Sequence, residues 1–378
     1  MKKHKYLPVI LTLALLIFSA CQKEVESNIV KLEPTVKKEL TLGKVKEIIP
    51  LETSDESLLD FVTKTYIDKE NNRVFVNADM NVYLFDTNGK FIKKLKKGKG
   101  PGEVNHIVSF TVDREIKRLY AIDVASYIHI FDYDVNFIES QKVNEFSSLD
   151  LHPLDKDNLF LFCSYVGRSQ KHFVGIYNLK EKKVVQRLVP GSESPYSIFC
   201  TGNASNFYEI EDRLFFTSSN IFGVFEFQAD TFRRNITYDL GDKAVPESFY
   251  ASYVERRKRS KFKNDAMKKD LIPFLKESFY FNDHYIAVLY DENSTCYAIN
   301  AKNRDKVYFK EQLSDYFNLP RVNSLIRACA VQGDFLTFAC SPLDFFEEDA
   351  TEERKTIEIA GQKIEIKYDM NPFLIVVE

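Results

Sequence analysis

The sequence contains no tryptophan and only 13 glycines in 378 residues. So little glycine excludes collagen-like proteins and glycine-rich linkers. The net charge is only −3, which excludes an overall basic nucleic-acid-binding protein but is compatible with a local basic patch. Aromatic residues are abundant instead, with 32 phenylalanines and 20 tyrosines in a chain that is 44% hydrophobic. This composition allows a large core and favours a β-rich globular protein.

Common motifs of catalysis and metal binding are also missing. The sequence has no Gly-x-Ser-x-Gly and no His-Glu-x-x-His. It has six histidines, and none of its six cysteines forms a Cys-x-x-Cys pair, so we expect no zinc-ribbon site and no cofactor. Cys163, Cys296 and Cys340 lie in apolar runs, which predicts small buried side chains. A disulfide among the cysteines that follow Cys21 is left open.

Residues 1–20 predict a bacterial signal peptide. Three lysines among the first five residues precede an apolar run over residues 7–18, which is too short to cross a bilayer. The following Ser-Ala-Cys is similar to the lipobox of bacterial lipoproteins, so Cys21 is the predicted site of lipid attachment. The alternative is an ordinary secreted protein that is cleaved nearby.

The residues after Cys21 indicate where such a lipoprotein goes. Residues 22–26 read Gln-Lys-Glu-Val-Glu, without the aspartate that often retains lipoproteins in the inner membrane. A lysine followed by acidic residues is similar to signals that carry some lipoproteins to the outer surface. We therefore expect an outer-membrane lipoprotein that faces the cell exterior, with a periplasm-facing protein as the alternative. Residues 21–39 are the predicted tether, and the chain without residues 1–20 has a net charge of −3 − 3 = −6.

Two repeating units determine the predicted architecture. A polar turn followed by an apolar strand occurs six times, with copies that begin at residues 73, 118, 158, 213, 284 and 334. A strand, a turn and a returning strand follow most copies, beginning at residues 82, 128, 174, 224 and, more faintly, 296. Four short strands in about 40–50 residues are typical of a propeller blade. We predict an all-β fold over residues 40–378: a six-bladed β-propeller of four-stranded antiparallel blades. Two β-sandwiches are the alternative.

Two long intervals between the repeats predict insertions. Residues 246–275 have few β-branched residues and loosely helical apolar spacing, which predicts a helical insert. Residues 343–370 contain an acidic loop and a predicted hairpin over residues 356–367. The run 372–377 is a predicted strand. We expect the segment around Val45–Ile49 to join the last blade and close the ring, which removes free sheet edges.

Four segments resemble a known family, the six-bladed β-propeller lipoproteins of Gram-negative bacteria, which are distantly NHL-like. They are Ile49-Pro-Leu-Glu-Thr53, Phe85-Asp-Thr-Asn-Gly-Lys90, Gly98-Lys-Gly-Pro-Gly-Glu103 and Asn371-Pro-Phe-Leu374. The resemblance covers most of the mature chain and is strongest over residues 48–135. It implies the fold and the location, because the family has no established general activity.

The segment Gly98–Glu103 is a candidate for ligand binding. Its glycines are superficially similar to a phosphate-binding loop, but the next element is a strand and Lys-Ser/Thr is absent. We interpret it as a crossover between blades whose glycines allow a sharp bend. Lys97, Lys99 and Glu103 are then expected to line one mouth of the ring.

His106 and His152 are 46 residues apart, about one blade, and each lies near the start of a predicted inner strand. Side chains at matching positions of neighbouring blades would point into the central channel, where some propeller enzymes hold a metal. No third ligand at this spacing is visible, so the presence of a metal is left open.

The helical insert carries six positive charges in eight positions, from Arg256 to Lys263. A solvated helix face explains them, and so does a docking surface for acidic glycans, lipid headgroups or a partner protein. We take Arg256, Arg257 and Arg259 as candidate binding residues and expect no nucleic-acid partner at this location.

These features predict a non-catalytic envelope lipoprotein that is anchored in the membrane by its lipid and binds a glycan, a peptide or an envelope protein. The alternative is a metal-dependent enzyme of the lactonase or lyase type, with Ca²⁺ or Zn²⁺ in the central channel.

Overall fold

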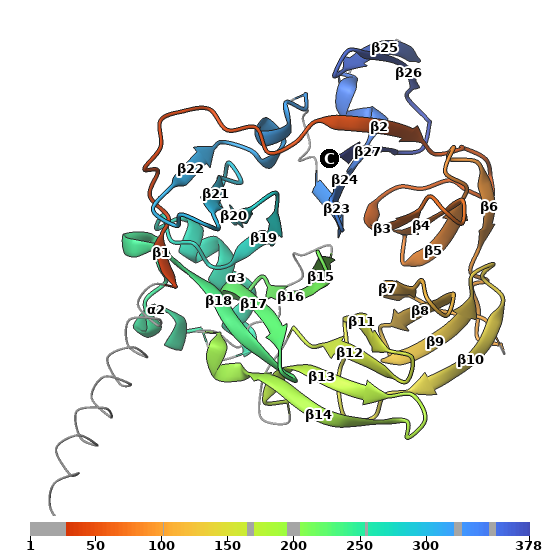
Figure 1. The fold of residues 1–378 in the computed structure, drawn as a ribbon, viewed down its shortest axis with the longest axis horizontal. Helices are drawn as coiled ribbons and strands as arrows, with labels where there is room; N and C mark the ends of the chain where they lie inside the picture. The colour runs from red at the N-terminus through yellow and green to blue at the C-terminus, as the bar shows by residue number, and fades with distance from the viewer. Residues whose placement is uncertain are drawn as a thin grey trace, which may run out of the picture.

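The structure, a computed structural model, describes residues 28–100, 102–164, 170–194, 205–253, 256–320, 327–347 and 353–378. Six sheets of at least four strands each are arranged around a common central axis (Figure 1). The predicted six-bladed β-propeller is therefore confirmed. Cys21 lies outside the described residues.

The first three blades follow one another along the chain. Blade 1 consists of β3 (Val62–Asp68), β4 (Arg73–Ala78), β5 (Asn81–Phe85) and β6 (Phe91–Lys94). Blade 2 consists of β7 (Ile107–Asp113), β8 (Arg118–Asp123), β9 (Tyr127–Asp132) and β10 (Phe137–Lys142). Blade 3 consists of β11 (Asp150–Asp155), β12 (Asn158–Phe162), β13 (His172–Asn178) and β14 (Lys183–Pro190).

The other three blades include the departures from the simple repeat. Blade 4 consists of β15 (Phe207–Ile210), β16 (Arg213–Ser218), β17 (Ile221–Gln228) and β18 (Thr231–Asp239), with β1 (Ile29–Lys31) outside β18. Blade 5 consists of β19 (Leu275–Phe281), β20 (His284–Leu289), β21 (Cys296–Asn300) and β22 (Val307–Lys310). Blade 6 consists of β23 (Arg327–Gln332), β24 (Phe335–Cys340), β27 (Phe373–Val377) and β2 (Val45–Pro50).

The six copies of the predicted polar turn and apolar strand are the second strands β4, β8, β12, β16, β20 and β24. Two of the turns before them, 211–212 and 282–283, have positive φ at both residues. Such turns match the twist of the strands that they join, and Asn and Asp tolerate this conformation. The second strands are apolar on both faces because each blade is covered by a neighbour on either side. The Phe160 and Phe207 rings of blades 3 and 4, for example, stack with centroids 5.6 Å apart.

Blade 6 closes the ring with two distant parts of the chain. Strand β27 pairs with β24 on one side and with β2 on the other, where Ile48 lies opposite Ile375. Ile49 is 2% exposed, so β2 contributes to the core. The prediction that Val45–Ile49 joins the last blade is confirmed.

The segment that we assigned to the tether contains strand β1. It pairs in parallel with the end of β18, with Ile29 opposite Thr237 and Lys31 opposite Asp239. Val30 is buried, 6% exposed. The chain therefore enters the described structure at the outer edge of blade 4 (Figure 1).

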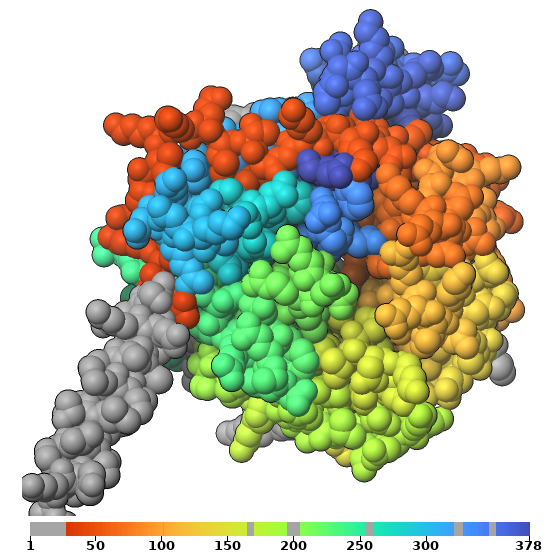
Figure 2. Space-filling view, in the orientation of Figure 1, coloured from red at the N-terminus to blue at the C-terminus, as the bar shows by residue number. Residues whose placement is uncertain are grey.

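Neighbouring strands of a blade run in opposite directions, so the turns and links that join successive strands alternate between the two faces of the ring. We call the side with the links between blades and between second and third strands the loop face. We call the opposite side, with the remaining turns, the turn face. Figure 2 shows the turn face, where the last residues of the chain are dark blue.

Both predicted inserts leave from the loop face. The first contains α2 (Glu247–Ala251) and α3 (Arg256–Met267) and links β18 to β19. The second contains the hairpin β25 (Arg354–Ile359) and β26 (Gln362–Lys367), which turns at Ala360 and Gly361 and projects from the rim of the ring (Figure 1). Among the described residues, neither helix is long and apolar enough to cross a membrane.

Candidate functional site

The inner strands place polar side chains at one level around the central axis, near the loop face. Each lies opposite the fifth residue of the second strand of its blade, and each is at most 9% exposed. They are Lys64, Ser109, Asp150, Asn206 and Glu277 from blades 1 to 5. We call this set the polar layer.

A carboxylate joins four blades in the polar layer. The Lys64 ammonium lies 2.8 Å from Asp150 Oδ1, and the Ser109 hydroxyl donates to the same oxygen at 2.5 Å. The Asn206 backbone N–H donates to Asp150 Oδ2 at 2.7 Å. Lys64 of blade 1 thereby contacts Asp150 of blade 3, with blade 2 between them. This ion pair stabilises the arrangement of the inner strands of these blades. Its buried charges are compensated by direct partners.

The polar layer can be compared with the alternative prediction of a metal-dependent enzyme. Such an enzyme would need several metal-binding side chains at one level of the inner strands. At this level the blades supply a lysine, a serine and an asparagine besides two carboxylates. Within the described ranges, no group of three or more His, Cys, Asp or Glu side chains could hold a metal ion.

His106 and His152 occupy different positions in their blades. His106 is exposed and precedes β7, with φ of 54°, and its carbonyl accepts the Val124 N–H. His152 is the third residue of β11, and its Nε2 lies 3.1 Å from Glu209 Oε1 of blade 4. This hydrogen bond lowers the pKa of Glu209. The two histidines therefore do not form one site.

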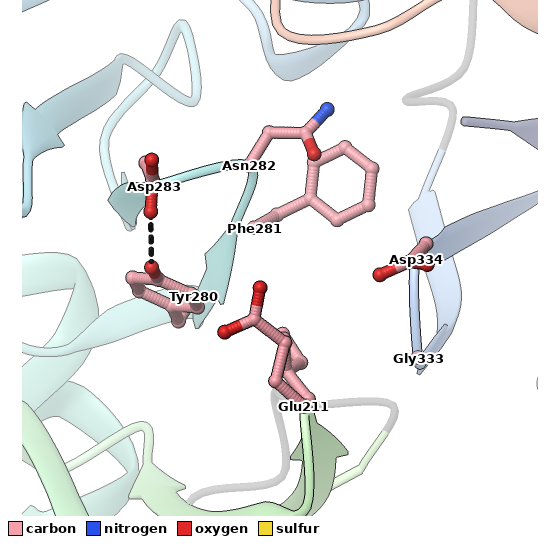
Figure 3. A pocket seen from close by; sticks show the side chains of 8 residues that line it. Glu211, Tyr280, Phe281, Asn282, Asp283, Gly333 and Asp334 are labelled. Carbon is pink, nitrogen blue, oxygen red and sulfur yellow. Dashed lines mark hydrogen bonds between the residues drawn. The ribbon is translucent and has the colours of Figure 1, made fainter.

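A pocket of about 340 Å³ opens on the turn face between blades 4, 5 and 6. Glu211, Asn282 and Asp334 line it, together with Phe281 (Figure 3). Asp283 also lines it, and this carboxylate accepts hydrogen bonds from Lys302 and Tyr280, which lower its pKa. The lining suits a positively charged group, but one of its carboxylates is already neutralised by the protein.

The segment Gly98–Glu103 bends back onto itself as a crossover on the loop face. Glu103 accepts the Gly100 N–H at 2.9 Å and the Lys96 ammonium at 2.7 Å, and the hydrogen bond from Lys96 is the main cause that lowers its pKa. Gly98 has φ of 157°, a backbone conformation that other residues rarely adopt, and an added Cβ would lie 1.9 Å from Glu103 Oε2. Lys97 donates to the Asp79 carbonyl at 3.2 Å. Glu103 and Lys97 thus hold the loop, while Lys99 is exposed.

A row of exposed apolar side chains follows this crossover on the loop face of blades 1 and 2. Its members are 50–59% exposed: Leu58, Phe61, Met80 and Val124. The Ile107 N–H donates to the Met80 carbonyl and the Val124 N–H to the His106 carbonyl, which places the turns of blades 1 and 2 side by side. The Asp79 carboxylate, next to Met80, accepts the Phe61 N–H. We call this set the apolar row.

Met80 is unusual within the apolar row. It forms a two-residue turn between β4 and β5 with Asp79, and the two residues have φ of 56° and 52°. Such a turn favours Asn-Gly, and a bulky side chain in this conformation costs about 1–2 kcal/mol. Met80 is thus an exposed thioether in a left-handed turn, a conformation that other non-glycine turn residues of this chain also adopt.

The helical insert has a small core of its own. Phe262 and Ala266 of α3 are at most 1% exposed and pack with Val245. Phe249 and Tyr250 of α2 cover the Phe262 ring. The candidate residues Arg256, Arg257 and Arg259 lie in the first turns of α3, and their side chains are outside the described part.

The structure places the predicted candidate residues in three parts of the molecule. Lys97, Lys99, Glu103 and His106 share the loop face near blades 1 and 2, His152 lies on an inner strand, and α3 lies between blades 4 and 5. Sequence reasoning missed the polar layer, although it left a signal. Each member stands seven to nine residues before a second strand.

The predicted burial of the cysteines is confirmed. Cys163, Cys296 and Cys340 are buried, as is Cys329. Burial raises the pKa of Cys329 and of Cys340 to about 12, so these thiols are unreactive at neutral pH. Cys200 lies outside the described residues.

Residues 25–378 match the family model described as "Domain of unknown function (DUF4934)". The chain belongs to the DUF4934 family. No curated protein matches its sequence. This family assignment covers the whole propeller, so the loop face and the polar layer lie inside the conserved domain model.

Several solved structures have folds that are similar to that of this DUF4934 protein. A protein of Bacteroides fragilis that is described as exported matches with a TM-score of 0.70 and 15% identity, over 93% of this chain and 99% of its own. The WD40 repeats of RRP9 match with a TM-score of 0.47 and 9% identity, over 90% and 100%. U3-55K matches with a TM-score of 0.46 and 12% identity, over 88% and 99%. The similarity to the Bacteroides fragilis protein supports the fold, and the similarity to the other two is too low to support any conclusion.

Proposed function

We propose that this DUF4934 protein is an exported, NHL-like propeller lipoprotein of the outer membrane that binds a partner protein through its loop face and catalyses no reaction. The apolar row carries this proposal. Loops on a rigid scaffold are the usual place for binding residues, and adjacent exposed apolar side chains mark interaction sites. A protein fits this row better than a small molecule, because small molecules are usually held in concave pockets that bury them.

Three observations support the proposed location. The sequence around Cys21 is similar to a lipobox, the chain resembles propeller lipoproteins, and a structural neighbour is described as exported. In cells that produce the protein, palmitate labelling should be lost in Cys21→Ser. Protease added to intact cells should degrade the chain if it faces the exterior. Labelling that persists in Cys21→Ser would contradict the lipid attachment.

The partner-binding role is tested with a photo-reactive amino acid at Met80 in the producing cells. We expect one discrete cross-linked protein. The matched control is Ile116, an apolar residue on the turn face of blade 2 that is 39% exposed. It should give no such product. Equal products from both positions, or none from Met80, would refute the role of the loop face.

A second variant separates binding from folding. Met80→Gly relieves the left-handed conformation and removes the thioether, so the free energy of unfolding should change by less than about 1 kcal/mol. Binding of the cross-linked partner should fall at least about tenfold, because Met80 is central in the row. Unchanged affinity for the purified partner would argue against the apolar row.

A further inference from the structure

We propose that the helical insert is a docking surface for anionic lipid headgroups, placed beside the point where the chain leaves for its lipid anchor. The proposal rests on the proposed lipid attachment for its orientation, but it makes a separate claim about α2 and α3. It assigns these helices a ligand class, the negatively charged membrane surface.

Charge is the first argument. Residues 243–270 contain nine lysines and arginines and four acidic residues, a net charge of +5. The mature chain has a net charge of −6, so the rest of it carries −6 − 5 = −11. An acidic protein that concentrates this much positive charge in one insert has a surface complementary to anionic lipids.

Five of the nine basic residues have described side chains, and several of these face solvent. Lys261, Lys268 and Lys269 of the insert are exposed, while Phe262 and Ala266 of the same helix are buried. Two of the acidic residues have basic neighbours: Asp270 lies 3.3 Å from Lys243, and Asp265 lies 3.9 Å from Lys268. Lys261, Lys268 and Lys269 therefore lie on the solvent side of the insert, together with the exposed acidic residues Glu247 and Asp270.

The position of the tether is the second, independent argument. Strand β1 pairs with the end of β18, and β18 leads directly into the insert. Lys31 of β1 lies beside Gly241, where an added Cβ would be 3.4 Å from the lysine Cε. In Figure 1, β1, α2 and α3 occupy the same corner of the ring.

The length of the tether limits the distance from the membrane. Cys21 precedes Ile29 by eight residues, which span at most about 28 Å when fully extended. An acylated Cys21 would therefore hold this corner near the headgroups. Electrostatic attraction acts within a Debye length of about 8 Å, so the insert would come within range as the tether relaxes. A lipid chain and a basic surface together give stable anchoring.

The test uses the mature chain with Cys21→Ser, so that no acyl chain contributes. We expect it to bind vesicles that contain phosphatidylglycerol at least about tenfold more tightly than vesicles of phosphatidylcholine, in salt of about 50 mM. Salt of about 500 mM should abolish the difference. Equal binding to both kinds of vesicle, or binding only to acidic polysaccharide, would overturn the proposal.

Matched variants locate the surface. Lys261→Gln, Lys268→Gln and Lys269→Gln together should weaken binding to the anionic vesicles at least about tenfold. The control removes the same charge from the turn face with Lys117→Gln, Lys180→Gln and Lys182→Gln, and it should bind like the parent. Circular dichroism and the unfolding temperature establish that both variants are folded. Equal losses in the two variants would overturn the proposal.

The outcome is distinct from that of the proposed function. If Cys21 is labelled with palmitate but the protein shows no preference for anionic vesicles, the proposed docking surface is contradicted and the lipid anchor is not. A preference for anionic vesicles without labelling would defeat the lipid anchor and leave the docking surface supported.

Discussion

Individual residues in this propeller are held by charge pairs whose burial differs widely. Lys64 and Asp150 have side chains that are 11% and 4% exposed, whereas Lys69 and Glu47 on the rim are 43% and 35% exposed. A buried charge without its partner is costly, and an exposed pair contributes little. The same substitution should therefore have very different effects at the two lysines.

Lys64→Met should lower the free energy of unfolding by about 3–5 kcal/mol, because it leaves the Asp150 carboxylate buried without its cation. Lys69→Met, the control, should change it by about 0–1 kcal/mol. Chemical denaturation of the two variants measures the difference. Adding Asp150→Asn to Lys64→Met should restore part of the loss. Similar effects of the two lysine substitutions would contradict our account of the polar layer.

The ion pair of Glu226 with Arg213 is expected to make the stability of the protein depend on pH. Arg213 donates to both of its carboxylate oxygens at 2.9 Å, which lowers the pKa of Glu226 below the ordinary 4.5. A carboxylate whose pKa is lower in the folded state stabilises the protein above its unfolded-state pKa. That stabilisation is lost as the pH falls through the folded pKa. Below pH of about 4.5, the parent should lose unfolding temperature more steeply than Glu226→Gln. Parallel curves would contradict the assignment.

At the scale of elements, two short N-terminal strands contribute differently. Strand β2 is the outermost strand of blade 6 and contains the buried Ile49. Strand β1 is a fifth strand, and blade 4 has four strands without it. We therefore expect β2 to be essential for the ring and β1 to be dispensable.

Two truncations test this expectation. A chain that begins at Leu32 lacks β1 and should unfold cooperatively, with a modest loss of stability. A chain that begins at Leu51 also lacks β2, exposes the edge of β27 and should be unfolded or aggregated. Scanning calorimetry and size-exclusion chromatography distinguish the two results. A stable monomer that begins at Leu51 would show that closure does not depend on β2.

The sequence alone predicted those strands and turns whose characteristic residues lie next to one another along the chain. The second strands were found because a polar turn precedes each apolar run, and the hairpin at Ala360-Gly361 because its turn residues are suited to positive φ. Strand β1 was missed because three residues carry no periodicity. The polar layer was missed because Lys64 and Asp150 meet only when the ring forms, 86 residues apart. The two histidines were wrongly paired because equal spacing along the chain does not fix equal register.

For the whole molecule, blade 4 lies across the ring from blade 1 (Figure 1). The tether and the basic insert are therefore far from the apolar row of blades 1 and 2. The insert and the apolar row share the loop face but lie at opposite sides of the ring, so a membrane that contacts only the rim at blade 4 would leave the apolar row accessible to a partner protein.

Fluorescent probes test this orientation on anionic vesicles. In a chain with Cys21→Ser and Cys200→Ser, the four buried cysteines should not label at neutral pH. A probe at Lys269→Cys should be quenched by lipids with spin-labelled headgroups, and a probe at Lys117→Cys should not. Equal quenching of the two probes would contradict the orientation.

The pairing of Pro50 with Phe373 has a consequence for how this protein is made. The outer strand of the last blade is synthesised about three hundred residues before the strand that accepts its hydrogen bonds. Until β27 is synthesised, β2 has no partner strand and the ring stays open, with unpaired sheet edges at both ends. Any chaperone or protease that recognises unpaired strands therefore acts on the chain before its last residues are made, and the pairing of β27 ends that exposure.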